Sequence, residues 1–379
     1  MKQKIFSWVS ILLFCVGSML SGCQSASSKI IKIGCAGPLT GDQAQLGMDT
    51  CQGVELAVAE ANQKQSIPGY VIELLKLDDQ HNPAQAVSVA KKFTTDRKVL
   101  AVIGHFNSSC TQPAAAVYNE VGLVQITPAS TNPAISKQGF KTFFRVAGTD
   151  DVQGPKGAQF AAHMLGIKSV FIIDDKTTYG KGLADEFQKE ALHLGIHVLG
   201  HEGLTQGDKD FSPLLTRIKP LKPELIYFGG IYTEGALLLR QAQALGLHAQ
   251  FMGGDGIAST VLIELAGTEA SEGVFATMVG GDTQKMPGAE GFITAYEAQY
   301  GRVGQWSAYG YDSANVALAA MAQAKKKDRA SVLSAMRAIP GFAGITGAIV
   351  FDEKGDNKNQ FIGIFKVVDG QLTYVGPAE

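Results

Sequence analysis

Short, continuously apolar segments alternate along the chain with longer segments in which apolar residues recur every three or four positions. The first apolar segments read IIKIGCAG, VIELLKLDD, VLAVIGH and LVQITPA. Between and after them, the spacing predicts helices over residues 48–62, 83–95 and 112–121. Continuously apolar strands are typical of parallel sheets that helices cover on both faces. The alternation therefore predicts an α/β fold with a doubly wound parallel sheet.

A second series of the same kind starts near Asp150. Its strands are predicted at SVFIIDD, HVLGHEGL, ELIYFGGI, QFMGGDG and GVFATMVGG, and its helices over 181–194, 211–219 and 234–245. Helices are then expected over 289–300, 308–324 and 329–338, followed by strands in AIVFDEKGD and FIGIFKVVDGQLTYV. No long linker separates the two series. The pattern predicts two Rossmann-like units, and the chain is long enough for both.

The N-terminal segment MKQKIFSWVSILLFCVGSMLSGC has the features of an export signal. Lys2 and Lys4 precede an uncharged stretch, which ends in Leu-Ser-Gly before Cys23. Such a stretch is too short for a typical membrane span. The ending resembles a bacterial lipoprotein signal, so we expect cleavage after residue 22, lipidation of Cys23 and a tether over 23–28. An uncleaved anchor and an ordinary cleaved signal remain the alternatives.

Charge and cysteine content narrow the function classes. Without residues 1–22 the chain has 31 basic and 35 acidic side chains, which argues against nucleic-acid binding. Three cysteines then remain besides Cys23, enough for one internal disulfide at most. We expect Cys35 to be buried in its strand without a partner. Cys51 and Cys110 could pair, although the sequence does not establish their distance.

Small, polar and acidic residues follow the predicted strands at the edge where such sheets bind ligands. In the first series these are the loops at 37–41, 107–111 and 128–131. In the second they are Asp174, Asp175 and Tyr179, Gly229-Gly230, and the loop at 253–256 with Asp255. Hydroxyl groups thus gather in one unit and a carboxylate stands in the other. This arrangement suits a ligand that carries both an acid and an amine.

The stretch AVIGHFNSSCTQP has two possible explanations. Asn107, Ser108, Ser109 and Thr111 precede a predicted helix, and each could cap its N-terminus. Alternatively, the free N–H groups and the positive end of the helix dipole could bind an anion, with the hydroxyls as further donors. The stretch by itself leaves both explanations open.

The motifs GHFNSSCTQPA, ITPASTNP, FRVAGTDDVQGP, DDKTTYGKGLA, GDKDFS and FMGGDG occur in this order along the chain. Together they resemble the leucine/isoleucine/valine-binding proteins, which are amino-acid receptors of bacterial ABC transporters. The resemblance runs from about residue 30 to 372. It implies a type I periplasmic binding protein with two lobes that close on the ligand, joined by crossovers near 149, 280 and 357. The lobes would comprise 29–149 with 281–356, and 150–280 with 357–379.

The resemblance also implies the roles of particular residues. Ser108 and Thr131 would bind the ligand α-carboxylate, with the carbonyls of Phe106 and Ala129 at the same subsite. The Ala129 carbonyl, the Thr131 hydroxyl and Asp255 would take the ammonium group. Under this interpretation the helix that follows Asn107 binds an anion at its N-terminus, and the capping side chains are part of the same binding site.

Tyr179 would close the site from the second lobe, as in the family. Four other positions depart from the family pattern. Asp255 stands where the family often has Glu, Leu46 and Ile231 replace aromatic residues of well-known members, and Trp306 lies near a family Phe. These differences leave the preferred ligand side chain open. The family disulfide between the regions of His81 and Asn107 is absent.

The implied function is that of an extracytoplasmic lipoprotein that captures a neutral, branched-chain L-amino acid and delivers it to a membrane permease. Expected partners are the amino acid and the permease subunits, with no nucleic acid and a monomeric state. The anchor would face the periplasm or the cell exterior. An aromatic amino acid or a small amide as ligand, and a sensor in place of the permease, remain alternatives.

The competing function class is an enzyme with the same fold, and the sequence contains little evidence for catalytic, cofactor or metal motifs. Ser108 has His105 nearby in sequence, but nothing orients that histidine towards it. Tyr179-Gly180-Lys-Gly182-Leu-Ala-Asp185 lacks the third glycine of a dinucleotide fingerprint and predicts a helix entry. His193, His197 and His201 are spaced by four, but glycines and β-branched residues interrupt a helix there. We therefore expect no catalytic residues, no metal site and no cofactor.

Overall fold

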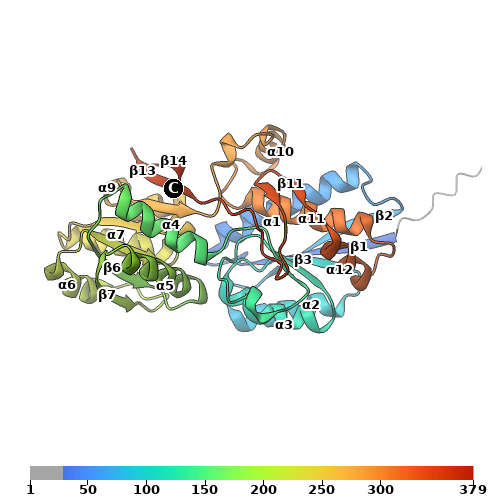
Figure 1. Ribbon diagram of the computed structural model, residues 1–379. Coiled ribbons are helices and arrows are strands. Elements are labelled where there is room, and N and C mark those ends of the chain that lie inside the picture. The colour runs from blue at the N-terminus through green and yellow to red at the C-terminus, as the bar shows by residue number, and fades with distance from the viewer. Residues whose placement is uncertain (1–28, 379) are drawn as a thin grey trace, which may run out of the picture.

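The computed structural model describes residues 29–378, and its first sheet is wholly parallel (Figure 1). The strand order is β2-β1-β3-β4-β5. The strands are β1 (Lys29–Gly37), β2 (Tyr70–Asp78), β3 (Val99–Ile103), β4 (Val124–Thr127) and β5 (Phe143–Arg145). The inner strands β3 and β4 are buried along their whole length, as expected of strands covered on both faces.

Helices from two distant parts of the chain cover this sheet. The first part supplies α1 (Ala44–Gln63), α2 (Pro83–Thr95) and α3 (Ser108–Glu120). The second supplies α10 (Glu290–Tyr300), α11 (Ser307–Gln323) and α12 (Arg329–Ala338). α1 packs against α11, and α2 packs against α3. Figure 1 shows α1 and α11 above the sheet, and α2 and α3 below it.

The second sheet is mixed, with the order β14-β13-β10-β9-β8-β6-β7. Its parallel strands are β6 (Ser169–Asp174), β7 (His197–Gly203), β8 (Leu225–Gly229), β9 (Gln250–Gly253) and β10 (Phe275–Met278). The antiparallel strands β13 (Gly363–Val368) and β14 (Gln371–Pro377) extend it at one edge. The helices that follow these strands or precede them are α4 (Asp150–His163), α5 (Thr178–His193), α6 (Ser212–Ile218), α7 (Tyr232–Ala244), α8 (Thr260–Ala266) and α9 (Thr268–Ser271).

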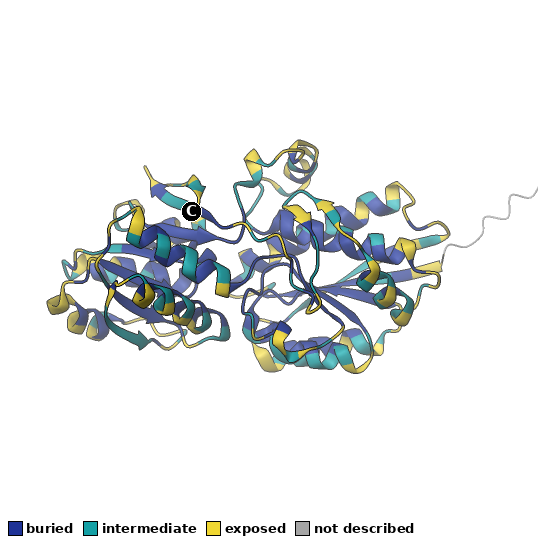
Figure 2. Cartoon of the chain, in the orientation of Figure 1, coloured by how far each residue is buried: buried dark blue, intermediate teal, exposed yellow. Residues whose placement is uncertain are grey.

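Each sheet forms the buried centre of a separate lobe, as the dark strands in Figure 2 show. Short elements complete the connections. They are the 3-10 turns η1 (Ser136–Gln138), η2 (Lys219–Leu221), η3 (Asp255–Ile257) and η4 (Thr283–Lys285), and the hairpin β11 (Phe342–Gly344) with β12 (Gly347–Ile349). Two lobes built around separate sheets agree with the two Rossmann-like units that the sequence predicts.

The chain passes between the two sheets three times: after β5, after β10 and before β13. The expected crossovers near 149, 280 and 357 lie in these connections. Residue Asp356 forms a parallel bridge with Arg145 of the first sheet, and their side chains form an ion pair at 2.6 Å. The exact lobe boundaries given above stay a prediction.

Several element predictions need correction. α3 begins at Ser108 and not at residue 112, so Pro113 lies inside the helix. α4 and β5 were not predicted, because α4 has a weak apolar stripe and β5 has only three residues. The second sheet is mixed, since the chain returns to it through the terminal hairpin β13–β14.

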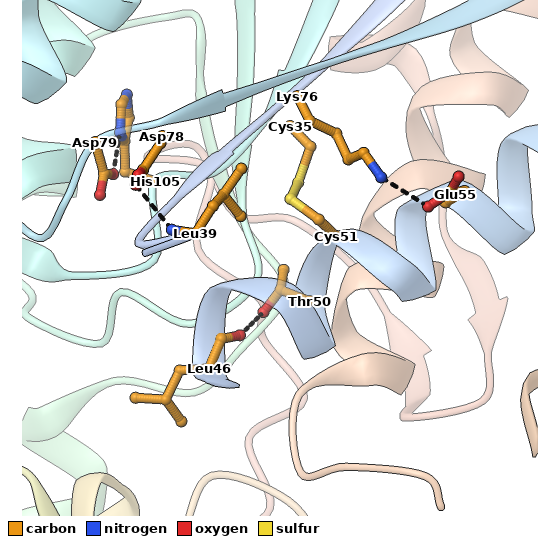
Figure 3. Close-up of a disulfide and its surroundings, with 10 residues drawn as sticks. All are labelled: Cys35, Leu39, Leu46, Thr50, Cys51, Glu55, Lys76, Asp78, Asp79 and His105. Carbon is orange, nitrogen blue, oxygen red and sulfur yellow. Dashed lines mark hydrogen bonds and ion pairs between the residues drawn. A yellow bond between two sulfur atoms is a disulfide. The ribbon is translucent and has the colours of Figure 1, made fainter. Parts of the chain in front are cut away.

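The cysteine prediction is wrong. Cys35 in β1 and Cys51 in α1 form a disulfide, with their Cα atoms 5.9 Å apart (Figure 3), whereas Cys110 is free and buried. Cys51 does not follow a strand end but lies inside α1, which packs directly over β1. The bond therefore joins the first strand of the sheet to the first helix that covers it.

The predicted signal, Cys23 and the tether lie outside the described residues. Within residues 29–378, none of the helices combines the length and apolar character needed to cross a bilayer.

Candidate ligand-binding site

A pocket lies between the two lobes, next to the carboxyl ends of the strands. It is lined by Leu46, Phe106, Asn107, Ser108, Ala129, Tyr179, Ile231, Asp255, Gly256 and Trp306. The structure thus brings together all the ligand-binding residues named from the sequence except Thr131, which is buried just beyond this lining. A larger and more open cleft meets this region at Leu46.

The N-terminus of α3 forms one wall of the pocket. Asn107 is the N-cap residue, but its side chain does not cap the helix and instead donates to Gln43 Oε1 at 2.9 Å. Thr111 turns inward and donates to the carbonyl of His105. Ser108 lines the pocket, and its hydroxyl accepts only a long bond, 3.3 Å, from the backbone N–H of Asn132. These polar side chains leave the positive end of the helix facing the pocket, which suits an anion.

The loop after β4 forms the adjacent wall. Thr127 fixes its backbone, because the Thr127 hydroxyl accepts from the backbone N–H of Ser130 at 3.0 Å. The Ser130 hydroxyl donates to the carbonyl of Phe106 at 2.8 Å and so ties this loop to α3. The carbonyl of Phe106 is therefore already bonded. Thr131 is fully buried, and its hydroxyl oxygen has no hydrogen-bond partner among the described residues.

Asp255 and Tyr179 face the pocket from the second lobe. Asp255 begins η3, directly after β9, and Tyr179 lies in the first turn of α5. The Tyr179 hydroxyl donates to Asp255 Oδ1 at 3.0 Å and accepts from the backbone N–H of Gly256 at 2.9 Å. Burial raises the pKa of Asp255 to about 6, although hydrogen bonds from Gln153 and Tyr179 oppose the shift. The site therefore contains a costly buried carboxylate that a ligand cation would stabilise.

The rest of the lining is apolar. Leu46 from α1, Phe106, Ile231 and Trp306 supply it, and each is buried. The rings of Phe106 and Trp306 pack edge to face with centroids 5.4 Å apart. Asp49, one turn after Leu46 in α1, accepts from the Trp306 backbone N–H at 2.6 Å. That bond fixes the start of α11, and with it the position of the indole ring.

Direct contacts join the lobes around the pocket. Asn132 Nδ2 donates to the carbonyl of Thr178 at 2.6 Å, and Tyr232 donates its hydroxyl proton to the carbonyl of Asp42 at 3.0 Å. Gln305 Nε2 donates to the carbonyl of Asp255 at 3.0 Å. The structure is therefore a closed form, in which the second lobe covers the pocket.

The geometry gives no support to a nucleophile–base pair at Ser108. His105 is fully buried, and its ring nitrogens contact Asp79 Oδ2 at 2.7 Å and the Tyr118 hydroxyl at 3.0 Å. Both nitrogens are thus occupied away from Ser108. The histidines spaced by four are separated in structure as well, because His193 ends α5 whereas the other two lie in β7. Among residues 29–378 there is no group of three or more candidate metal ligands.

Two lining residues, Asn107 and Gly256, are not among the ligand-binding residues predicted from the sequence, although the first is a candidate helix cap and the second belongs to the loop at 253–256. Asn107 stands in a quoted motif, and its position next to Ser108 could have suggested it. Gly256 contributes its backbone, and a Cβ there would come within 2.4 Å of the carbonyl oxygen of Gly230. Close backbone approach of this kind gives no side-chain pattern that a sequence could show.

Comparisons with known proteins agree with this architecture. The model of the periplasmic binding protein family matches residues 30–371. The leucine-, isoleucine-, valine-, threonine- and alanine-binding protein of Pseudomonas aeruginosa is 38% identical over 336 residues, which is 88% of this chain and 89% of that protein. The Leu/Ile/Val-binding protein homolog 1 of Brucella abortus is 35% identical over 378 residues, 99% of this chain and 100% of that protein.

Two solved structures share the fold. The leucine binding protein LivK of Thermotoga maritima has a TM-score of 0.86 at 32% identity, over 92% of this chain and 98% of that one. LivJ of Streptococcus pneumoniae, in complex with isoleucine, has a TM-score of 0.85 at 27% identity, over 92% of this chain and 100% of that one. With the lobes and pocket described above, these matches show that the chain belongs to the periplasmic binding protein family, as a solute-binding protein and not an enzyme.

Proposed function

We propose that this protein captures a neutral, branched-chain L-amino acid in the pocket between its lobes and delivers it to an ABC permease. The observation that carries this proposal is the opposition of two kinds of polar group across one apolar pocket. Ser108 and the N-terminus of α3 lie on one side, and Asp255 lies on the other. An α-amino acid has the complementary pair of charges.

The carboxylate subsite would consist of the first lobe's donors. The Ser108 hydroxyl is held at the entrance of α3 and makes only one long contact, so it can donate to a ligand oxygen. The Thr131 hydroxyl is the second donor, on the adjacent loop. Helix N-termini hold carboxylates without any cationic side chain, which is consistent with the absence of Lys and Arg from the pocket lining.

The ammonium subsite would be formed by Asp255, with the Thr131 hydroxyl and the carbonyl of Ala129 as further acceptors. Tyr179 holds the carboxylate of Asp255 in place at 3.0 Å. Burial destabilises the ionised carboxylate of Asp255, and a ligand cation beside it would stabilise that ionised form. Closure of the second lobe would bring this group to the ligand.

The apolar lining favours an aliphatic side chain. Asp255 is the sole charged residue among those lining the pocket, and the ammonium group would engage it. A ligand with an acidic or basic side chain would therefore bury an unpaired charge. Leu46, Ile231 and Trp306 offer apolar surface instead, worth about 25 cal/mol for each Å² buried. The amino acids after which the relatives above are named point in the same direction, as does the isoleucine bound to LivJ.

A competition panel on purified protein, stripped of ligand by unfolding and refolding, tests this function. We expect leucine, isoleucine and valine to bind tightest by calorimetry and to raise the melting temperature. Phenylalanine, alanine and leucinamide test the size and carboxylate requirements, and 3-methylbutanoate tests the need for an amine. The assignment is wrong if glutamate, arginine or 3-methylbutanoate displaces leucine.

We also propose that Cys23 carries a lipid that anchors the exported protein to the membrane, so that it works beside its permease. The family is periplasmic, and a lipid on Cys23 would hold the protein at the membrane surface without a membrane span. A Cys23→Ala variant is expected to leave the membrane fraction and to keep its affinity for amino acids. Detection of an unmodified Cys23 at the N-terminus of the membrane-bound wild type, by mass spectrometry, would contradict the proposal. If the protein serves a sensor in place of a permease, the amino acid should trigger signalling without being taken up.

A further inference from the structure

His105 and Asp79 form a fully buried pair behind the pocket, and neither residue is part of the pocket lining. His105 Nδ1 lies 2.7 Å from Asp79 Oδ2 (Figure 3). An ionised carboxylate only accepts hydrogen bonds, so the Nδ1–H group is the donor. The other ring nitrogen, Nε2, bonds the hydroxyl of Tyr118 at 3.0 Å. The imidazole ring is therefore held at both ends in a single orientation.

The two partners of the ring are themselves anchored to different elements. Asp79 directly follows β2, and its backbone N–H donates at 3.0 Å to the carbonyl of Gly37, the last residue of β1. Asp79 Oδ1 accepts from the backbone N–H of His81 at 3.0 Å. Tyr118 is buried near the end of α3. The ring thus connects the carboxyl end of the first sheet to the helix whose N-terminus faces the pocket.

The backbone carbonyl of His105 connects two further segments. Thr111 of α3 donates its hydroxyl proton to this carbonyl at 3.0 Å, and Thr127 at the end of β4 donates at 2.9 Å. These two hydroxyl groups engage both lone pairs of the oxygen. The Ser130 hydroxyl lies beside them, 2.6 Å from the hydroxyl of Thr111. One carbonyl oxygen therefore ties α3 to the loop that follows β4.

These two segments carry the donors of the proposed carboxylate subsite. Ser108 is the first residue of α3, three positions after His105, and Thr131 follows Ser130 in the loop after β4. Lys and Arg are absent from the pocket lining, so carboxylate binding would depend on hydroxyl and backbone N–H donors. Such donors act only within a narrow range of distance and angle, and they need support from the residues behind them.

We propose that His105 is a positioning residue for ligand binding. Fixed by Asp79 and Tyr118, it sets the distance between Ser108 and Thr131 and so prepares the subsite for the ligand carboxylate before the ligand arrives. The inference rests on the proposed function, since it needs a ligand with a carboxylate. Preparing the subsite in advance raises affinity because binding then has fewer groups to order.

Tyr118→Phe removes one of the two bonds of the ring and keeps the aromatic side chain. We expect the affinity for leucine, measured by calorimetry at pH 7, to fall roughly three- to tenfold. Tyr311→Phe is the matched control, because the Tyr311 hydroxyl bonds Glu60 at 3.1 Å in the same lobe and lies outside the pocket lining. The control should bind leucine as the wild type does. A purely structural role would lower the melting temperature of Tyr118→Phe and leave its affinity unchanged, which would overturn the inference.

Asp79→Asn removes the other bond and should lower the affinity at least as much. If this variant does not fold, Tyr118→Phe carries the test by itself. Each change is then combined with Ser108→Ala. Because the positioning acts through the carboxylate subsite, the combined loss should be smaller than the product of the separate losses, by about threefold or more.

The outcomes separate this inference from the proposed function. Losses that multiply in the double variants would show that the ring does not act through Ser108, and would refute the inference alone. Wild-type affinity in Tyr118→Phe would do the same. A wild-type protein that binds no amino acid would refute the proposed function and the inference with it.

Discussion

Asp255 illustrates how single residues at this site serve binding at the expense of stability. Burial raises its pKa from the ordinary value of 3.8 to about 6, so the folded protein resists ionisation of this group. Above pH 6 the protein therefore carries an energetic penalty, of about 3 kcal/mol at roughly 1.4 kcal/mol per pKa unit. Well below pH 3.8 the carboxyl group is protonated in both folded and unfolded states, and the penalty disappears.

We therefore expect Asp255→Asn to stabilise the ligand-free protein at pH 7, by up to about 3 kcal/mol. The same variant should lose roughly two to three orders of magnitude in affinity, because the ligand ammonium would be buried without its counter-charge. Denaturant unfolding at pH 7 and pH 4 tests the first expectation, and calorimetry tests the second. Equal stability of variant and wild type at pH 7, or an affinity change below threefold, would contradict this account.

At the residue scale, the sequence predicted much of the pocket through its motifs. Ser108, Tyr179 and Asp255 lie where the resemblance implies, but their roles stay predictions until binding is measured. The partners of buried polar groups could not be predicted, since they depend on the distances between separate loops. Asn107 bonds Gln43, which is 64 positions away, and this contact is visible only in three dimensions.

At the scale of elements, the contact between α1 and α11 unites two distant parts of the chain in the first lobe. It is unusually close, because glycines replace side chains at the crossing. A Cβ on Gly310 of α11 would lie 2.2 Å from the backbone carbonyl oxygen of Thr50 in α1. A Cβ on Gly53 of α1 would similarly lie 2.0 Å from the carbonyl oxygen of Ser307. Leu46 lies in α1 and Trp306 is the N-cap residue of α11, so the spacing of the two helices shapes the pocket.

Gly310→Ala is expected to force these helices apart and to cost about 1–3 kcal/mol of stability, as overpacking usually does. Gly291→Ala is the matched control. Gly291 lies in α10 with open space around its missing Cβ, so alanine there should gain up to about 1 kcal/mol from helix propensity. Urea unfolding of both variants measures the difference. A Gly310→Ala protein as stable as the wild type would show that the helices can separate at no cost.

The Cys35–Cys51 bond is the second link between elements, since it joins β1 to α1 across 16 positions of the chain. A loop of this length predicts a stabilisation of about 3 kcal/mol through the unfolded state. The variant with both cysteines changed to Ala should melt earlier by a corresponding amount and still bind amino acids. Dithiothreitol should lower the melting temperature of the wild type and leave that of the variant unchanged. If dithiothreitol also lowered the melting temperature of the variant, its effect on the wild type would not come from this disulfide.

Hydrophobic periodicity along the sequence did not predict every element or every link between elements. The long alternation of strands and helices predicted most elements, because periodicity depends on many residues at once. The disulfide was missed because pairing depends on which helix lies over which strand. α4 was missed because glycine and proline interrupt its apolar stripe, and it is held by packing against α5.

At the scale of the whole molecule, the contacts between lobes decide how firmly the pocket closes. The Tyr232 hydroxyl of the second lobe donates to the carbonyl of Asp42 in the first lobe, and neither residue lines the pocket. A ligand that binds the closed form gains this contact as well as its own. Small-angle scattering should therefore show a more compact particle after saturation with leucine, because ligand binding shifts the population towards closure.

Tyr232→Phe removes this hydroxyl and leaves the pocket lining unchanged. A neutral hydrogen bond contributes about 0.5–1.5 kcal/mol, so we expect the affinity for leucine to fall roughly two- to tenfold, mainly through faster dissociation. Tyr374→Phe serves as the control, because β14 lies at the outer edge of the second sheet. Stopped-flow displacement measures the dissociation rate, and scattering without ligand reports the average opening of the lobes. If Tyr232→Phe released leucine no faster than the control, closure would depend on the ligand and the connecting strands, and this contact between the lobes would have no part in it.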